Sequence, residues 1–191
     1  MNLMRHLSFG IVRITAALLL STLSGALHAF SSGSIVCSVP LIPFSPMAST
    51  LSNPTPTGWS LLSDARFYQP GALVQLRIIN TDVLKKVKGV LLWAQFDDFA
   101  TPAGSFIIGP GTPWKYVSPS PSAQCLQGSV THDNPTPKTQ AELIFNWTAP
   151  ESGKVYLRAF LIEDCTSSCR SNQALTQTIE LFEAISINGF E

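Results

Sequence analysis

Apolar and polar positions alternate in two stretches of the chain. From Val74 to Ile78 every second residue is large and apolar, and the same holds from Leu143 to Trp147. Such alternation is typical of a strand with one face against a core and one face toward water. Both stretches are therefore predicted to be half-buried strands.

The stretch from Gly89 to Gln95, GVLLWAQ, is apolar almost throughout. It predicts a strand that is buried on both faces, in a sheet covered by another layer. Shorter strands are expected at residues 104–108, 155–162 and 176–182, with turn residues between them and no run of helical period. Six or so short strands of this kind predict an all-β fold, an antiparallel β-sandwich.

The first 29 residues have a different pattern. They contain Arg5 and Arg13 but no acid, then an apolar run from Ile14 to Leu23, and they end in small residues at Ala29. This order is typical of a secretory signal peptide, and an apolar run of about ten residues is too short to cross a bilayer, which needs about twenty. We expect a signal peptide at 1–29, a single domain at 30–191, no membrane span and an extracellular, secreted protein.

The near balance of acidic and basic residues bears on whether the protein binds nucleic acid. The chain has 12 basic and 12 acidic residues, and loss of Arg5 and Arg13 leaves 12 − 2 = 10 basic residues and a net charge of −2. A domain whose main partner is nucleic acid is usually strongly basic. We therefore expect no nucleic-acid partner.

Four cysteines follow the predicted signal peptide, namely Cys37, Cys125, Cys165 and Cys169. An even number in an exported chain predicts two disulfides, for which three connectivities exist. The pairs Cys37–Cys125 and Cys165–Cys169 are favoured because the second pair closes a short local loop. The bridge at Cys37 is expected to hold a proline-rich, irregular arm over residues 38–58. A zinc site is disfavoured because the spacing of the four cysteines is irregular.

Candidate catalytic residues are few. His132 is the only histidine after residue 29, and no nucleophile motif such as G-x-S-x-G accompanies it. We expect His132 to hydrogen-bond the loop near Cys125. Asp97 and Asp98 lack the regularly spaced acidic loop of a calcium site and predict a solvated turn. The sequence predicts neither an enzyme nor a bound cofactor or metal.

The sequence offers more candidates for ligand binding than for catalysis. Lys85, Lys86 and Lys88 form a dense basic cluster that is suited to an anionic ligand. The competing interpretation is an edge strand that its lysines protect from aggregation. Trp59 and Trp114 lie in predicted proline-rich loops, where each is either exposed for ligand contact or packed over the core.

The sequon Asn146-Trp147-Thr148 is a third kind of candidate site. Two other Asn-x-Thr triplets have proline in the middle, which disqualifies them. If Trp147 points inward, Asn146 points outward, so the sequence predicts an accessible N-glycosylation site.

An ordered set of motifs resembles the reeler domain family over residues 37–162. The motifs are Tyr68-Gln69-Pro70-Gly71, Lys88-Gly89-Val90-Leu91-Leu92-Trp93-Ala94-Gln95, Gly104-Ser105-Phe106, Cys125, Gly128-Ser129-Val130-Thr131-His132, Lys138 and Trp147-Thr148-Ala149-Pro150. The resemblance implies an extracellular, immunoglobulin-like antiparallel β-sandwich with disulfides. In layout the chain is similar to the stand-alone, secreted, insect-type defence proteins of this family.

The resemblance implies a binding role and leaves two partners open. The favoured expectation is recognition of a microbial surface glycan or lipid in innate defence. The alternative is an extracellular-matrix or signalling module that binds a host protein or glycosaminoglycan, for which the three lysines are the motivating feature.

Overall fold

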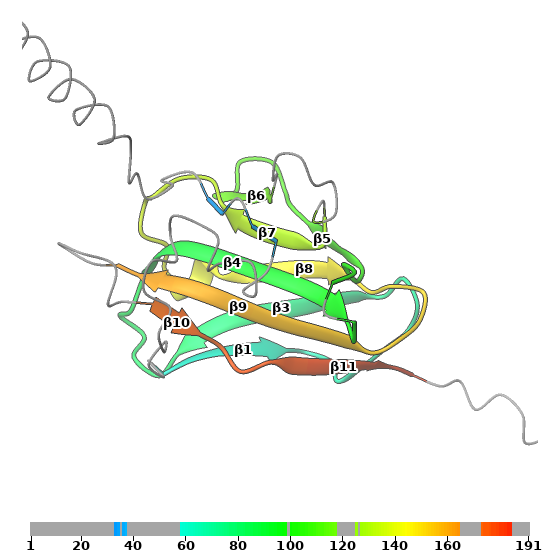
Figure 1. The fold of residues 1–191 in the computed structure, drawn as a ribbon. Coiled ribbons are helices and arrows are strands. Elements are labelled where there is room, and N and C mark those ends of the chain that lie inside the picture. The colour runs from blue at the N-terminus through cyan, green and yellow to red at the C-terminus, as the bar shows by residue number, and fades with distance from the viewer. Residues whose placement is uncertain are drawn as a thin grey trace, which may run out of the picture.

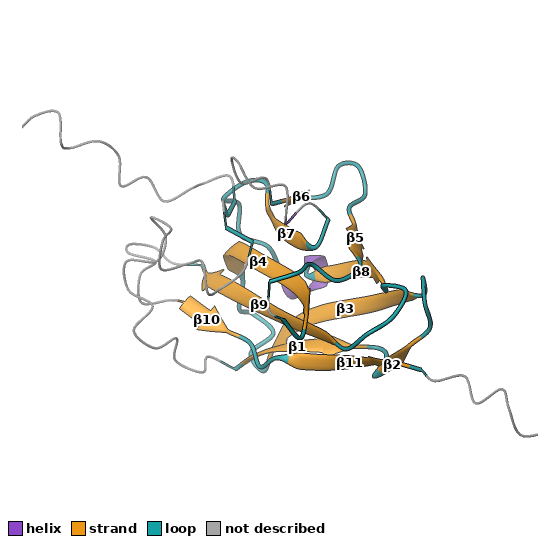
Figure 2. Ribbon diagram, turned by 45° about the vertical axis from the view of Figure 1, so that its right-hand side comes forward, coloured by secondary structure: helices purple, strands orange, loops and turns teal. Residues whose placement is uncertain are grey.

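Two β-sheets packed face to face make up the fold (Figures 1 and 2). The structure is a computed structural model that describes residues 33–34, 36–37, 58–98, 100–117, 125, 127–164 and 173–184. The predicted signal peptide, most of the proline-rich arm, Cys165 and Cys169 lie outside these residues.

The smaller sheet has four strands in the order β1-β3-β8-β5. Their bounds are β1 Trp59–Ser63, β3 Leu73–Asn80, β8 Ile144–Thr148 and β5 Ser105–Ile107. All of their pairings are antiparallel. A short 3-10 helix, η5 (Gln140–Glu142), leads into β8.

The larger sheet has seven strands, with the path β2-β11-β9-β4-β7-β6 and β10 paired to β9. Their bounds are β2 Phe67–Tyr68, β4 Val87–Phe96, β6 Trp114–Tyr116, β7 Ser129–His132, β9 Val155–Glu163, β10 Gln173–Leu175 and β11 Ile179–Glu183. Its pairings are antiparallel apart from the short parallel pair of β2 and β11. The predicted all-β sandwich is confirmed, with more strands than the six or so expected.

Strands β3 and β8 bury alternate residues, as their sequences predict. Val74 lies opposite Trp147 in the register of the pair, and both side chains face the larger sheet. Trp147 is fully buried, and its Nε1 donates to the carbonyl oxygen of Ala103 at 3.0 Å. Gly104, with φ +62°, passes so close that an added Cβ would lie 2.3 Å from the Thr148 carbonyl oxygen. Only glycine fits there.

Strand β4 is buried on both faces, which confirms the expectation for its apolar run. Val90 and Leu92 face the smaller sheet and belong to the main core. Leu91 and Trp93 face the other way, where a second apolar cluster covers them. That cluster also contains Phe160 of β9, Val117 and Cys125, with Val36 and Cys37 packed against it.

The favoured pairing of Cys37 with Cys125 is present. The bridge joins residues 88 positions apart, with their Cα atoms 5.2 Å from each other. Residues next to Cys37 are also bonded to β7, because Ser129 Oγ donates to the Cys37 carbonyl oxygen at 2.8 Å and the Ser34 amide donates to Thr131 Oγ1 at 2.8 Å. The bridge therefore holds a cover over the outer side of β4.

Trp59 and Trp114 do not lie in loops. Trp59 is in β1 and Trp114 is in β6, and both are buried in the main core. The ring of Trp114 packs on Phe145 with centroids 4.8 Å apart. Core packing, which a local proline-rich composition does not reveal, decides the state of both tryptophans. Of the two interpretations, packing over the core is right.

Removal of the bridge in the double variant Cys37→Ser/Cys125→Ser is expected to lower the free energy of unfolding by about 4 kcal/mol, because the unfolded chain regains the freedom of a long loop. The outer face of Trp93 also loses its fixed cover, so its fluorescence should shift toward that of exposed tryptophan. Urea unfolding followed by fluorescence measures both effects. Unchanged stability with an unchanged spectrum would contradict the role given to the bridge.

Candidate functional site

The three predicted binding lysines lie where the chain passes from β3 to β4. Lys85 and Lys86 belong to the β3–β4 loop, residues 81–86, and Lys88 lies in β4. Lys86 is exposed, whereas Lys85 and Lys88 are half-buried. Strand β4 lies between β9 and β7 in the larger sheet. The interpretation as a protected edge strand is therefore wrong, since β4 has no free edge along most of its length.

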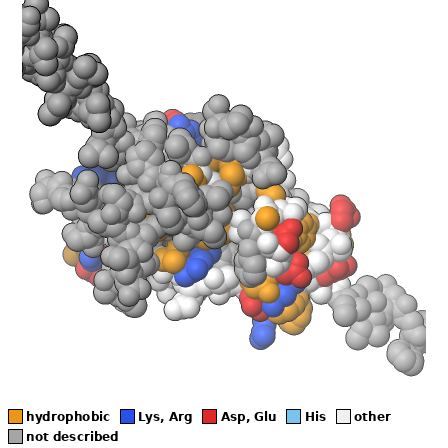
Figure 3. Space-filling model, in the orientation of Figure 1, with side chains coloured by type: hydrophobic (Ala, Val, Ile, Leu, Met, Phe, Trp, Pro, Cys, Tyr) orange, Lys and Arg blue, Asp and Glu red, His pale blue; other side chains and the backbone are white. Residues whose placement is uncertain are grey.

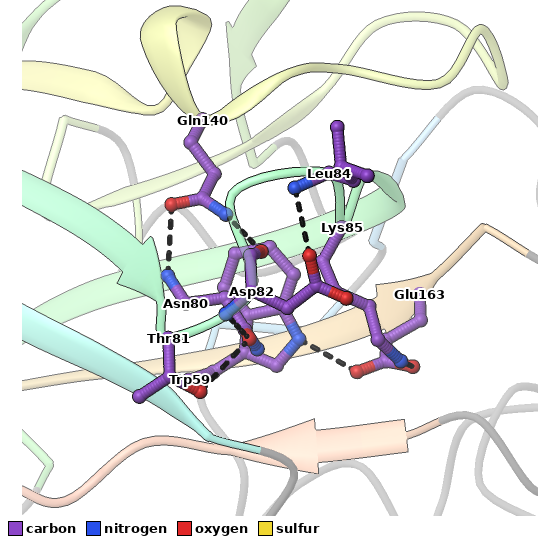
Figure 4. Close-up of polar contacts among 8 residues, drawn as sticks. All are labelled: Trp59, Asn80, Thr81, Asp82, Leu84, Lys85, Gln140 and Glu163. Atoms are coloured by element: carbon purple, nitrogen blue, oxygen red, sulfur yellow. Dashed lines mark hydrogen bonds and ion pairs between the residues drawn. The ribbon is translucent and has the colours of Figure 1, made fainter.

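Lys85 takes part in a buried polar network beneath the loop (Figure 4). Its Nζ lies 2.9 Å from Oε2 of Glu163, and Trp59 Nε1 donates to Oε1 of the same carboxylate at 2.8 Å. Glu163 is only 5% exposed, so it needs these partners to offset the cost of burying its charge. Lys85 therefore has a structural role that joins the loop to β9 and β1.

Lys88 also has an acidic partner, since its Nζ lies 2.9 Å from Oδ1 of Asp164. Figure 3 shows the same tendency on the face drawn there, where Lys and Arg side chains lie in small separate groups with Asp and Glu near several of them. The lysines of this cluster are thus partly balanced by acids that the sequence places far away. They do not form a uniform basic field in the described part of the chain.

Side chains at its base hold the β3–β4 loop in one shape (Figure 4). Gln140 bridges it, because Gln140 Oε1 accepts from the Asn80 amide at 2.9 Å and Gln140 Nε2 donates to the Asp82 carbonyl oxygen at 2.7 Å. Within the loop, Asn80 Oδ1 accepts from the Asp82 amide at 2.8 Å and Asp82 Oδ1 accepts from the Leu84 amide at 3.0 Å. These are the local side-chain bonds that stabilise turns.

Two large apolar side chains project from this loop. Val83 is 79% exposed and Leu84 is 82% exposed, the highest values among the exposed large apolar residues of the described chain. Exposed Lys86 follows two residues later. We call Val83, Leu84 and Lys86 the amphiphilic tip. The sequence reasoning missed it, although an apolar pair between Asp82 and two lysines is a visible signal.

Lys138 is one of the motif residues quoted from the sequence, but its structural role was not predicted. It is 1% exposed, and its Nζ donates to the carbonyl oxygens of Thr136 at 2.8 Å, of Lys88 at 3.4 Å and of Asn134. Asn134 and Thr136 each precede a proline, so this segment is poor in backbone donors. The amine supplies the missing donors and fixes residues 134–138 to the start of β4.

Burial has an electrostatic consequence for this amine. Desolvation lowers the pKa of Lys138 below its ordinary value, and the nearby charges of Glu142 and Asp133 act in the opposite direction. The ring of Trp114 lies 6.0 Å from the ammonium. Lys138 is thus a structural cation within the fold, close to the base of the lysine cluster.

The other candidate residues have local structural roles. His132 is buried in β7, and its Nδ1 accepts from the Val90 amide of the neighbouring strand β4 at 3.2 Å. The expected bond to the loop near Cys125 stays a prediction, since most of that loop lies outside the described residues. Asp98 accepts from the amides of Ala100 and Thr101 in an exposed turn, and its bonds to Thr101 lower its pKa. Within the described residues, no three His, Cys, Asp or Glu side chains group as metal ligands do.

Asn146 lies in β8 and is exposed, while Trp147 next to it points into the core. Its predicted outward orientation is therefore confirmed, and its modification stays a prediction. No helix in the described part of the chain combines the length and the apolar character that a membrane crossing requires.

Comparisons with known proteins find a matching domain family and similar solved structures. The model of the Reeler domain family matches residues 42–167. Two crystal structures of the human F-spondin reeler domain each have 20% identity and a TM-score of 0.52, and they cover 69% and 71% of this chain and 93% and 98% of their own. A structure described as the Reelin-N domain of F-spondin has 21% identity and a TM-score of 0.50. The match covers 69% of this chain and 90% of that structure's chain. No curated protein matches the chain.

We expect Lys138→Met to lower the free energy of unfolding by about 1–3 kcal/mol, because three partly buried hydrogen bonds from a charged donor are lost. Lys115→Met is a matched control. Lys115 pairs with Asp133 at 3.6 Å and is 40% exposed, so its loss should cost under about 1 kcal/mol.

The same pair of variants tests the lowered pKa of Lys138. Between this lowered value and the ordinary pKa of the unfolded chain, the unfolded state binds more protons. The unfolding free energy of the natural chain should therefore rise with pH relative to Lys138→Met across that alkaline window. A difference that stays constant or shrinks there would refute the burial of a charged amine.

Proposed function

The chain belongs to the Reeler domain family, and on this premise we propose that it is an extracellular binding module of innate defence that recognises microbial surfaces. The proposed contact is the amphiphilic tip on the β3–β4 loop, and the proposed ligand is an anionic glycolipid. The observation that carries the proposal is the combination of Val83, Leu84 and Lys86, all exposed, on a loop that side-chain hydrogen bonds hold in place.

Three features support an extracellular role for residues 30–191 as one domain. The Cys37–Cys125 bridge is the kind of bond that persists in oxidising compartments. The pattern of residues 1–29 is that of a signal peptide, and Asn146 offers an exposed sequon. Binding is proposed in place of catalysis because His132 is buried and its Nδ1 is already used by a backbone amide.

The chemistry of the amphiphilic tip matches a lipid that carries phosphate groups. Burial of a Val or Leu side chain contributes about 1.5–3 kcal/mol, and a lysine near an anionic surface contributes about 1 kcal/mol. The three residues together thus supply about 4–7 kcal/mol, which corresponds to dissociation constants from about 1 mM to about 10 μM. Such a weak single contact suits a surface that presents many copies of its ligand.

The alternative partner, a host protein or glycosaminoglycan, draws on the lysine cluster. Sulfated glycans bind through charge, and here Lys85 and Lys88 already have acidic partners in Glu163 and Asp164. A purely ionic ligand also leaves the exposed Val83 and Leu84 without a role. The two apolar side chains therefore favour the glycolipid.

The test is sedimentation of the purified chain with vesicles that contain lipopolysaccharide. Val83→Ser/Leu84→Ser should weaken binding by about 100-fold, the equivalent of about 3 kcal/mol of lost burial, and Lys86→Ala by about fivefold. Leu73→Ser is the matched control, because Leu73 is 60% exposed but lies at the far end of β3. It should bind like the natural chain.

Retention on heparin separates the two partners. If the triple variant of Lys85, Lys86 and Lys88 to Ala loses heparin binding while Val83→Ser/Leu84→Ser keeps both heparin and vesicle binding, the glycolipid proposal is wrong and the matrix alternative is supported. Vesicle binding that depends on Val83 and Leu84 supports the proposal.

A further inference from the structure

The outer face of the smaller sheet carries several exposed apolar side chains. These are Leu62 (40% exposed), Leu73 (60%), Ile79 (37%), Ile107 (53%) and Ile144 (44%). They come from all four strands of the sheet, β1, β3, β5 and β8. They are interleaved with polar residues such as Arg77 and Gln75, and a group that covers them would reduce the exposed apolar area.

Asn146 lies in the middle of this outer face. Its cross-strand neighbours are Gln75 of β3 on one side and Ile107 of β5 on the other. Ile144 precedes it by two residues on the same strand and therefore on the same face. The sequon asparagine is thus bordered by two of the exposed apolar side chains.

A groove opens beside Asn146. It has a volume of about 450 Å³ and is lined by Asn146, Ile107 and Ile144 together with the β5–β6 segment through Thr112 and Pro113. This volume lies in the range of about 300–1,000 Å³ that small-molecule sites have. The groove offers apolar walls from the two isoleucines and polar atoms from Thr112 and Glu142 at its border.

We propose that Asn146 carries an N-linked glycan whose first sugar unit lies in this groove and covers Ile107 and Ile144. The sequon supplies the attachment point, and burial of Trp147 directs the Asn146 side chain outward. A pyranose ring has an apolar face of C–H groups and a polar rim, which suits a groove with isoleucine walls and polar borders. The covering group is therefore the protein's own modification.

The inference rests on the export that the proposed function requires, since sugar is added in the secretory pathway. It does not rest on the ligand of the β3–β4 loop. Attachment leaves the main core unchanged, because Asn146 points away from it. The glycan is expected to increase solubility. It covers apolar side chains that would otherwise contact those of neighbouring molecules.

Attachment is tested on the full chain expressed in eukaryotic cells and purified from cells and medium together, by intact mass and by free-thiol labelling of the same sample. The expected result is a glycan-sized mass increase together with an oxidised Cys37–Cys125 bridge. Asn146→Gln and Thr148→Val should both abolish the increase. An oxidised bridge without the mass increase overturns the glycan alone, whereas a reduced bridge without it contradicts export and with it the proposed function.

Placement in the groove is tested on the folded glycoprotein, which avoids any effect on folding. The glycan is trimmed to one sugar, or removed by an amidase that hydrolyses the side-chain amide of Asn146 and leaves an aspartate there, so the signals of unglycosylated Asn146→Asp are the reference for full removal. Methyl NMR signals of Ile107 and Ile144 should shift on full removal but little on trimming, with those of Leu62 as the control on the same face. Binding of a dye that reports exposed apolar surface should rise severalfold. Unchanged isoleucine signals and unchanged dye binding would overturn the placement.

Discussion

Strand β4 carries large apolar side chains on both faces, so each face needs a cover. The smaller sheet covers Val90 and Leu92 on the inner face. The segment around the Cys37–Cys125 bridge, with Val117, covers Leu91 and Trp93 on the outer face. Fully burying such side chains contributes about 1.5–3 kcal/mol each, which explains why a strand of this composition is central and why a covalent link secures its outer cover.

The candidate binding loop follows from the same strand. Because β4 is fixed on both faces, its first residues form a firm base for the β3–β4 loop. Lys138 donates to the Lys88 carbonyl oxygen, and Lys85 joins the loop to Glu163 of β9. Polar and charged residues thus hold the base, while Val83 and Leu84 stay in solvent at the amphiphilic tip. A fixed loop loses little conformational entropy when it meets a ligand.

Much of the fold could be predicted from local pattern, but the site could not. The alternation in β3 and β8 and the apolar run of β4 are periodic signals, and each predicted its strand and its burial. The ion pair of Lys85 with Glu163 joins residues 78 positions apart, so it depends on the register of β4 with β9, which local sequence does not encode. The burial of Lys138 was not predicted for the same reason, since lysine is usually exposed and only the tertiary fold encloses it.

The central claim is that the β3–β4 loop is the surface that meets an anionic glycolipid. Amide NMR spectra of the isotope-labelled chain, recorded during titration with lipopolysaccharide micelles and with uncharged detergent micelles as the control, test it most directly. Shifts and line broadening are expected to concentrate at residues 81–88 and to appear only with the anionic lipid. Changes confined to another face, with residues 81–88 unaffected, would contradict it.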